Sequence, residues 1–394
     1  MLLFEIVSVP AVADVTSILN GTTSEPSYGA GYSVQQTIDG GYIIAGTKYS
    51  DEPKFLSQMV WLIKTDSNGD TIWDRIFGGS HNDVGYSVQQ TDDGYIITGS
   101  TESFGAGGSD LWLIKTDATG NEVWNRTFGG PRGDWGHSVQ QTNDGGYVII
   151  GSKYSYDVAH QSQMVWLIKT DAKGNRVWDR IFGGPRDDWG NSVQQTSDGG
   201  YIITGATKSY GSGGNSALWL IKTDANGIEA WDKSFSGLGN TVGYSVQQTD
   251  DGGYIIAGSK VPPGERTGEI WLIRTDTTGT EVWDKTFGGF ADDVGKSVQQ
   301  IRDGGYIITG SKASSSGGGQ NVWLIKTDAF GDEAWDKTFG ESGWNEGKSV
   351  EQTSDGGYII TGSTYPYRVG GRNRAAWLIK TDENGKKIWD RTIS

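Results

Sequence analysis

The chain contains no cysteine and only three histidines among its 394 residues. Without cysteine, disulfides, thiolate metal sites and a cysteine nucleophile are excluded. His81, His137 and His160 fall in separate segments, so a metal site built from three histidines is not expected. The G-x-S-x-G and H-E-x-x-H motifs are absent, and so is a phosphate-binding loop. The sequence therefore predicts no metal and no cofactor.

Basic residues and long apolar runs are also scarce. Lys and Arg together number 33 against 48 Asp and Glu, which gives a net charge of −15 and a pI near 4.7. A negative field of this size repels phosphate backbones, so we expect no nucleic-acid partner. No apolar run reaches the ~18 residues that a membrane-spanning helix needs. We therefore expect no membrane span.

Residues 1–27 differ from the rest of the chain. They contain a short apolar stretch that ends in Ala11-Val12-Ala13, a pattern typical of a signal-peptidase site with cleavage after Ala13. Against this interpretation, the segment has no basic beginning, and Glu5 interrupts its apolar part. We interpret it as an N-terminal segment and lead-in, and we expect a secreted or cell-surface protein.

What the chain does have is one pattern of about fifty residues, repeated seven times. A serine followed by Val and Gln or Glu marks each unit, at Ser33, Ser87, Ser138, Ser192, Ser245, Ser297 and Ser349. In the first unit, four segments rich in β-branched and aromatic residues are bounded by Gly, Asp or Asn. These predicted strands, called A to D, cover 31–37, 40–46, 60–66 and 71–77. Such a period with several short strands predicts a β-propeller.

Seven complete units predict one all-β domain over residues 28–394. We expect a seven-bladed β-propeller with four antiparallel strands per blade. Because the last unit ends on its own strand D, the ring should close by packing of blade seven against blade one, without a swapped strand. Strand C is a nearly continuous apolar run, as expected in a sheet that is covered on both faces.

Each unit has two tryptophans twelve residues apart, such as Trp61 and Trp73. Fourteen of the 17 tryptophans belong to these pairs, and we expect them to pack between neighbouring blades. The charged residues that recur beside them, such as Lys64, Asp74 and Arg75, are expected to form ion pairs at the blade edges.

Three recurring segments carry a resemblance: DGGYIIAGSK at 251–260, WLIKTDANG at 219–227 and WDKTFGG at 283–289. They resemble the propeller repeat of archaeal and bacterial surface proteins and lipoproteins, whose lineage is similar to the quinoprotein propellers. The quinoprotein docking motif D-x-x-x-G-x-x-x-W is matched, with one residue fewer, by Asp117, Gly120 and Trp124. The resemblance covers roughly residues 28–394 and implies the fold. The adjacent cysteines and calcium cluster of those enzymes have no counterpart, and the lipoprotein cysteine is missing too, so neither activity nor anchor is implied.

The units differ most between strands B and C and between strand D and the next strand A. Propeller topology places these two sets of loops at one end of the ring, and loops on a rigid frame commonly carry binding residues. We therefore predict that this end is the ligand face. Its D-to-A loops hold the three remaining tryptophans, Trp135, Trp189 and Trp344. These could fill space between loops or form a stacking platform for a sugar or peptide.

Acidic residues of the same loops add a second set of candidate ligand-binding residues. Asp134, Asp188 and Asp293 are conceivable members of a glycosidase acid pair. Their equivalent positions in different units, however, favour a role as loop caps.

The residue before each marker serine varies from unit to unit and is expected near the mouth of the central channel. Tyr86, His137 and Tyr244 occupy this position and complete the candidate ligand-binding set. Further along strand A, a ring of glutamines is broken only by Glu351, which we interpret as a drifted glutamine.

Together these features predict a non-enzymatic extracellular or cell-surface binding module, a monomer whose ligand is a glycan or a surface protein. A carbohydrate-active enzyme with acidic residues at the channel mouth is one alternative, and a purely structural surface scaffold is another. The sequence leaves catalysis open and favours binding.

Overall fold

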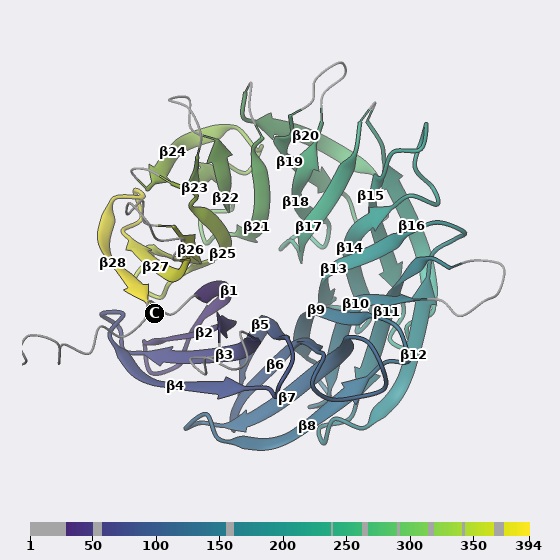
Figure 1. Cartoon of the computed structure of the whole chain (residues 1–394). Helices are drawn as coiled ribbons and strands as arrows, with labels where there is room; N and C mark the ends of the chain where they lie inside the picture. The colour runs from purple at the N-terminus through teal and green to yellow at the C-terminus, as the bar shows by residue number, and fades with distance from the viewer. Residues whose placement is uncertain are drawn as a thin grey trace, which may run out of the picture.

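The computed structural model describes residues 29–49, 57–154, 161–237, 239–261, 267–289, 292–313, 319–340, 343–365 and 374–394. In these ranges the chain forms 28 strands and no helix. The strands make seven four-stranded antiparallel sheets around a central channel (Figure 1). The predicted seven-bladed β-propeller is thus confirmed, while the segment 1–27 and its cleavage site lie outside the described residues.

Each blade consists of four consecutive strands, A to D from the channel outward (Figure 1). Blades one and two comprise β1 (Gly29–Gln36), β2 (Tyr42–Tyr49), β3 (Gln58–Thr65), β4 (Thr71–Phe77), β5 (Asp83–Thr91), β6 (Gly94–Thr101), β7 (Asp110–Asp117) and β8 (Glu122–Phe128). Blades three and four comprise β9 (Asp134–Gln141), β10 (Tyr147–Tyr154), β11 (Gln163–Thr170), β12 (Arg176–Phe182), β13 (Asp188–Gln195), β14 (Tyr201–Thr207), β15 (Ala217–Thr223) and β16 (Glu229–Phe235). Blades five and six comprise β17 (Thr241–Gln248), β18 (Tyr254–Lys260), β19 (Glu269–Thr275), β20 (Glu281–Phe287), β21 (Val294–Gln300), β22 (Tyr306–Ala313), β23 (Gln320–Thr327) and β24 (Glu333–Phe339). Blade seven comprises β25 (Glu346–Gln352), β26 (Tyr358–Thr364), β27 (Ala375–Thr381) and β28 (Lys387–Ile393).

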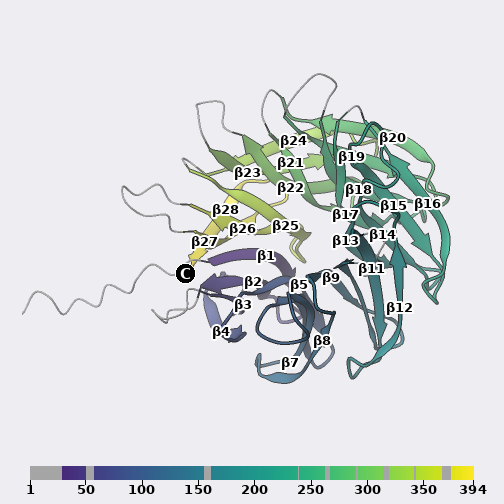
Figure 2. The same cartoon turned by 45° about the vertical axis from the view of Figure 1, so that its right-hand side comes forward.

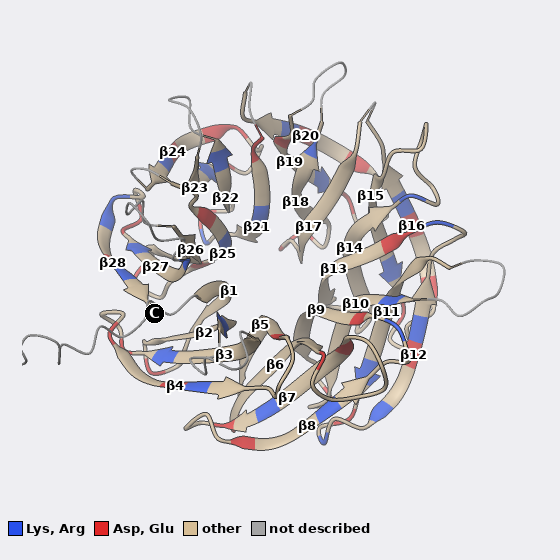
Figure 3. Cartoon of the chain, in the orientation of Figure 1, with Lys and Arg blue, Asp and Glu red and all other residues tan. Residues whose placement is uncertain are grey.

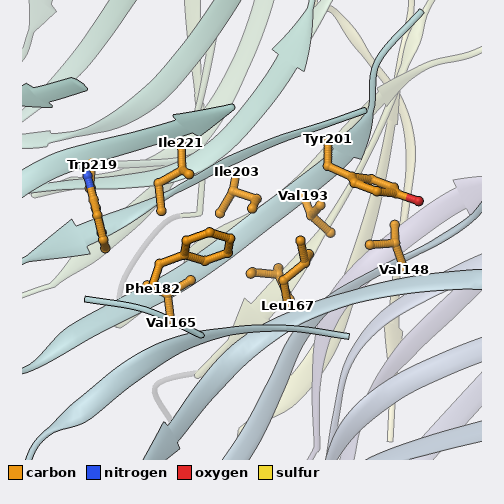
Figure 4. Close-up of a cluster of buried hydrophobic side chains, with 10 residues drawn as sticks. Val148, Val165, Leu167, Phe182, Val193, Tyr201, Ile203, Trp219 and Ile221 are labelled. Carbon is orange, nitrogen blue, oxygen red and sulfur yellow. The ribbon is translucent and has the colours of Figure 1, made fainter. Parts of the chain in front are cut away.

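The hydrophobic core is divided among the interfaces between blades. Seven clusters of buried side chains each join two neighbouring blades. Figure 4 shows the cluster in which Val165 and Leu167 of blade three meet Ile203 and Trp219 of blade four. Because both faces of strands B and C are covered in this way, their apolar runs are buried almost without interruption. The predicted packing of the tryptophans between blades is confirmed.

The second tryptophan of each blade lies on the C-to-D turn of the next blade. Gly120 in that turn has a φ of +80°, and a Cβ built there would lie 2.6 Å from Trp73 of the preceding blade. Trp73 also meets Tyr95 of strand β6 edge to face, at 5.9 Å between ring centroids. The turn therefore needs glycine both for its backbone conformation and for the close approach of the indole.

The same contact closes the ring between blades seven and one, an interface that we call the seam. A Cβ on Gly69 of blade one would lie 2.6 Å from Trp389 of blade seven, and Tyr42 packs edge to face against the same indole. Figure 2 shows β25–β28 lying against β1–β4. In the described residues the ring thus closes by packing, without a swapped strand, as predicted.

Ion pairs recur in every blade, as predicted for the lysine of strand C, while in blade one Asp74 takes another role. Lys64 Nζ lies 2.9 Å from Asp39 in the A-to-B turn, and it also donates to the carbonyl of Thr65. Asp74 instead accepts the indole N–H of Trp61 at 2.8 Å. Lys64 lies near the end of strand C, beside the A-to-B turn. Its ammonium is nearly buried and therefore needs a carboxylate partner, which Asp39 of that turn provides.

A belt of hydrogen bonds links the seven A strands around the channel. The first glutamine after each marker serine accepts, through Oε1, the N–H of the second glutamine in the next blade, as in Gln195 N–H to Gln140 Oε1 at 2.6 Å. We call the seven accepting residues the glutamine ring: Gln35, Gln89, Gln140, Gln194, Gln247, Gln299 and Glu351. Glu351 stands at the seam and accepts the N–H of Gln36 through Oε2 at 2.5 Å. A single titratable group therefore completes the belt.

Gly174→Ala tests the contact between tryptophan and turn. Gly174 has a φ of +75°, and a Cβ there would lie 2.5 Å from Trp124. Gly145 has a similar φ of +79°, but a Cβ there would meet nothing within 4 Å, so Gly145→Ala is the matched control. In urea denaturation we expect the control to lose about 1 kcal/mol of unfolding free energy. Gly174→Ala should lose roughly 1–3 kcal/mol more from the clash. Equal losses would contradict a packing role for this glycine.

Glu351→Gln tests the titratable position of the belt. Burial raises the pKa of Glu351 to about 7 from its ordinary 4.5, although the hydrogen bond from Gln36 opposes the shift. Because the folded-state pKa is the higher one, the stability from the protonated acid is complete below pH 4.5 and is lost as the pH rises through 7. Glu351→Gln should therefore gain stability over the wild type across this window, up to roughly 3 kcal/mol at pH 8. The measurement is the unfolding free energy at pH 5 and pH 8, with the exposed Glu383→Gln as control. If the difference in unfolding free energy between Glu351→Gln and the wild type does not grow from pH 5 to pH 8, the raised pKa of Glu351 is contradicted.

Candidate ligand-binding site

The residue before each marker serine is the bulged residue of its A strand. In β1, Gly31 pairs with Gly46 and Ser33 with Ala45, so Tyr32 has no partner across the sheet. The same shift occurs in all seven A strands, at Tyr32, Tyr86, His137, Asn191, Tyr244, Lys296 and Lys348, which we call the mouth ring. A bulge releases its side chain from the alternation of the strand and can direct it to a site. Here the bulges give seven side chains of varied chemistry one common position.

The mouth ring lies at the predicted end of the channel. Each A strand starts from the D-to-A loop, and the ring residue is the third or fourth residue of the strand. The A strands have seven to nine residues, so the ring lies near their middle, closer than the glutamine ring to the end with the D-to-A and B-to-C loops. The structure brings together Tyr86, His137 and Tyr244 of the predicted set, on the strands nearest the channel (Figure 1).

One side of the mouth ring is aromatic and uncharged. The rings of Tyr32 and Tyr86 are 5.4 Å apart between centroids, and those of Tyr86 and His137 are 5.7 Å apart. Burial, with a smaller effect of Tyr32, raises the pKa of Tyr86 to about 12. Burial likewise lowers the pKa of His137, which also contacts the side chain of Asn191. The histidine is therefore a neutral imidazole at pH 7, which does not favour a role as a cation.

The other side of the mouth ring is cationic. Lys296 Nζ lies 3.4 Å from the ring centroid of Tyr244, a cation–π contact. Among the described residues it forms no hydrogen bond and no ion pair, although the carboxylate of Glu346 attracts it electrostatically. Burial and the neighbouring Lys348 lower the pKa of Lys296 to about 7. Blue bands on β21 and β25 beside the channel mark this side in Figure 3.

Lys348 belongs to a small cluster with Glu346 and Arg374 of blade seven. Lys348 Nζ lies 2.6 Å from Glu346, and Arg374 lies 3.6 Å from the same carboxylate. Burial acts to raise the pKa of Glu346, but Lys348 and Arg374 hold it below its ordinary value. Arg374 also lies over the rings of Tyr32 and Tyr365. Lys348 and Arg374, joined by Lys296 below its pKa of about 7, thus outnumber the one carboxylate in a protein of net charge −15.

A second tier lies toward the opposite end of the channel, next to the A-to-B turns. The valine after each marker serine and the glutamine ring line a cavity of about 270 Å³. Its walls are apolar at the valines and polar at the amides. Along each strand the two tiers are three residues apart, about 10 Å.

The predicted acids are loop caps and do not form a catalytic pair. Asp134 and Asp188 are fully buried and Asp293 nearly so. Asp188 accepts the N–H groups of Gly184 and Ser209 at 2.9 and 3.2 Å, and so joins its own D-to-A and B-to-C loops. Burial raises the pKa of Asp134 and Asp293, against opposing hydrogen bonds from backbone N–H groups. Each acid serves its own blade, so no two of them face one common space.

Two of the three extra tryptophans lie in strands and not in the loops where they were predicted. Trp135 and Trp189 are the second residues of β9 and β13, and only Trp344 precedes its strand. Trp189 lies under Lys208 and bonds to Gln163, while Trp135 packs near Tyr154. Trp344 is 53% exposed and belongs to blade seven, across the channel from blades three and four (Figure 1). The three indoles therefore do not form one platform.

Glu346 and Arg374 were missed as site residues. Glu346 follows Asn345, which takes the buried cap position that Asp188 holds in blade four and bonds to Thr364. The sequence signal is a substitution within the repeat, because Glu346 stands where Trp189 stands in blade four.

Two broader features are absent from the described ranges. No group of three or more His, Asp or Glu residues there lies close enough to hold a metal ion. The same part of the chain holds no helix that is long and apolar enough to cross a membrane.

Comparison with known proteins shows the fold and no more. No protein-family model matches the chain, and no curated protein matches its sequence. The β-propeller domain of the trilobed protease from Pyrococcus furiosus, described as having an open velcro topology, is 11% identical with a TM-score of 0.52, over 95% of this chain and 97% of that one. The Neurospora crassa Pan2 WD40 domain is 9% identical with a TM-score of 0.51, over 85% of each chain. A puromycin hydrolase mutant is 11% identical with a TM-score of 0.54, over 94% of this chain and 54% of that one. The chain is therefore a β-propeller whose structural neighbours include a WD40 domain, a domain of a protease and a hydrolase.

Asp188→Ala tests the cap. The substitution would leave two backbone N–H groups and the hydroxyl of Ser209 without their acceptor. We expect a loss of roughly 3 kcal/mol in unfolding free energy, since buried donors without partners are costly. Asp92→Ala removes the same charge from an exposed turn and should change stability by less than about 0.5 kcal/mol. A small effect of Asp188→Ala in chemical denaturation would show that the carboxylate is not structural.

Proposed function

We propose that the protein is a non-enzymatic binding module, secreted or at the cell surface, whose ligand face is the end of the propeller with the D-to-A and B-to-C loops. The proposed ligand is a glycan, and its contact point is the mouth ring. One observation carries the proposal. The frame repeats seven times with little change, yet the seven bulged positions at the channel mouth differ in shape, polarity and charge.

The chemistry of the mouth ring suits an oxygen-rich ligand with some negative charge. Lys296 forms no ion pair in the described residues and is an ammonium below its pKa of about 7, and Tyr32 and Tyr365 lie beside the guanidinium of Arg374. Aromatic rings and cations together are typical of sites that recognise sugars carrying acidic groups. The surrounding negative charge of the protein would disfavour large polyanions at longer range.

The arrangement of acids supports binding over catalysis. A glycosidase needs two carboxyl groups on opposite sides of one bond, about 5–10 Å apart. Asp134, Asp188 and Asp293 are instead each bound to the backbone of their own loops. The surface-protein repeats that the sequence resembles fit an exported monomeric binding module, and that relationship is part of the proposal.

Glycan binding by the full chain tests the proposal. We would screen an array of neutral and acidic glycans with the wild type and with Lys296→Gln, which removes the unpaired ammonium. We expect binding to at least one acidic glycan, weakened 10-fold or more by Lys296→Gln. Lys173→Gln makes the same charge change in an exposed C-to-D turn at the opposite end and should bind as the wild type does. If the wild type binds no glycan, or Lys296→Gln binds equally well, the proposed site is wrong and a protein partner becomes the alternative.

A further inference from the structure

The glutamine ring presents hydrogen-bond donors to the channel and almost no acceptors. A backbone N–H can only donate, so the atom that accepts it from the next blade must be the amide oxygen Oε1. The amide nitrogens Nε2 of the six glutamines are then left at the cavity wall. In the described part of the chain no protein acceptor bonds to any of them.

The second glutamine of the strands shows the contrast. Gln195 donates its Nε2 to the carbonyl of Gly199 at 3.3 Å, and its Oε1 accepts the N–H of Asn143. Both ends of that amide are used by the protein. In Gln194, one residue earlier, only the oxygen is used, and the residue lines the cavity. Unused donors are therefore a property of the glutamine ring.

We propose that the channel cavity is a binding site for a small oxyanion, such as sulfate, phosphate or the carboxylate of a sugar acid, held by the Nε2 groups of the glutamine ring. A guest in this cavity meets amide N–H groups and valine side chains, so it must bring its own acceptors. Oxyanions carry many acceptor lone pairs in a small volume. A hydrogen bond from N–H to a charged oxygen is also stronger than one to a neutral oxygen. The cavity of about 270 Å³ has room for one such group with water.

Glu351 sets the charge of the site. The residues that line the cavity beside it, Gln299 of β21 and Gln35 of β1, are neutral, as is Gln36, which donates to it. Tyr42 of β2 is the nearby titratable group, and its pKa is raised to about 12, mainly by burial. No cation in the described ranges forms an ion pair with Glu351. Because Glu351 ionises near pH 7, anion binding should be tighter when it is protonated. This site lies below the mouth ring and does not depend on the proposed glycan function.

The test is isothermal titration of sulfate into the full-length wild type and two variants at pH 6 and pH 8. Sulfate keeps its charge over this range, so any pH dependence belongs to the protein. Glu351→Gln converts the last member of the ring into a donor and should bind sulfate at least 10-fold tighter than the wild type at pH 8. Gln194→Glu keeps an oxygen that can accept the N–H of Gln248, in the way that Glu351 accepts the N–H of Gln36. The substitution removes one amide donor from the ring and adds one negative charge. It should bind at least 10-fold more weakly at pH 8.

Matched controls separate this site from the mouth ring. Asn143→Asp adds the same charge in the exposed A-to-B turn of blade three and should leave sulfate affinity unchanged. Parallel titrations with phosphate and glucuronate identify the source of the oxyanion, since preference for glucuronate indicates a sugar acid and preference for sulfate or phosphate a free inorganic ion.

The proposal is overturned if Glu351→Gln binds no tighter than the wild type at pH 8. It is also overturned if Lys296→Gln abolishes sulfate binding while Gln194→Glu keeps it, because the anion then sits at the mouth.

Discussion

The contact between the second tryptophan of one blade and the glycine turn of the next is the interaction on which the ring depends. Seven copies of it are present, and the one between Trp389 and Gly69 joins the last blade to the first. A β-propeller has no central core, so each blade must find its apolar partner in its two neighbours. The indole provides area, and the glycine allows the turn to approach it closely. Because all seven contacts have nearly the same geometry, each blade is rotated by the same step and the last one meets the first without a swapped strand.

Closure also determines which groups remain for binding. The belt of hydrogen bonds between A strands uses the carbonyl end of each ring glutamine, and the packed strands B and C are buried on both faces. The bulged residues are different, because they pair with no residue across their own sheet and meet one another around the channel. A change at such a position costs the frame little, so these positions can carry tyrosine, histidine, asparagine or lysine while the rest of the unit repeats. The repeated frame and the side chains of the proposed binding site therefore use different residues of the same strand.

Much of this architecture could be predicted from the sequence, because a seven-fold period makes each local pattern appear seven times. The strands, the position of the paired tryptophans and the closing packing all follow from patterns within one unit. Contacts between units are harder to predict. Lys64 was expected at a blade edge, but its partner Asp39 is set by the meeting of strand C with the A-to-B turn. Asp188 was recognised as a loop acid, yet its burial follows from two loops closing over it. Glu346 begins strand β25 and Arg374 directly precedes strand β27, and only the folded blade brings them together.

Symmetry explains why the departures from the repeat matter more than the repeat itself. Seven equal side chains around an axis favour no direction across the channel, so they can hold a ligand on the axis but cannot orient it. Orientation must come from residues that differ between blades. Charged departures are concentrated in neighbouring blades six and seven, at Lys296, Lys348 and Glu351. Blade one adds Tyr32 next to the guanidinium of Arg374. The side of the channel next to the seam is therefore where an asymmetric ligand would gain its preferred orientation, and the aromatic blades opposite would serve mainly as an uncharged wall.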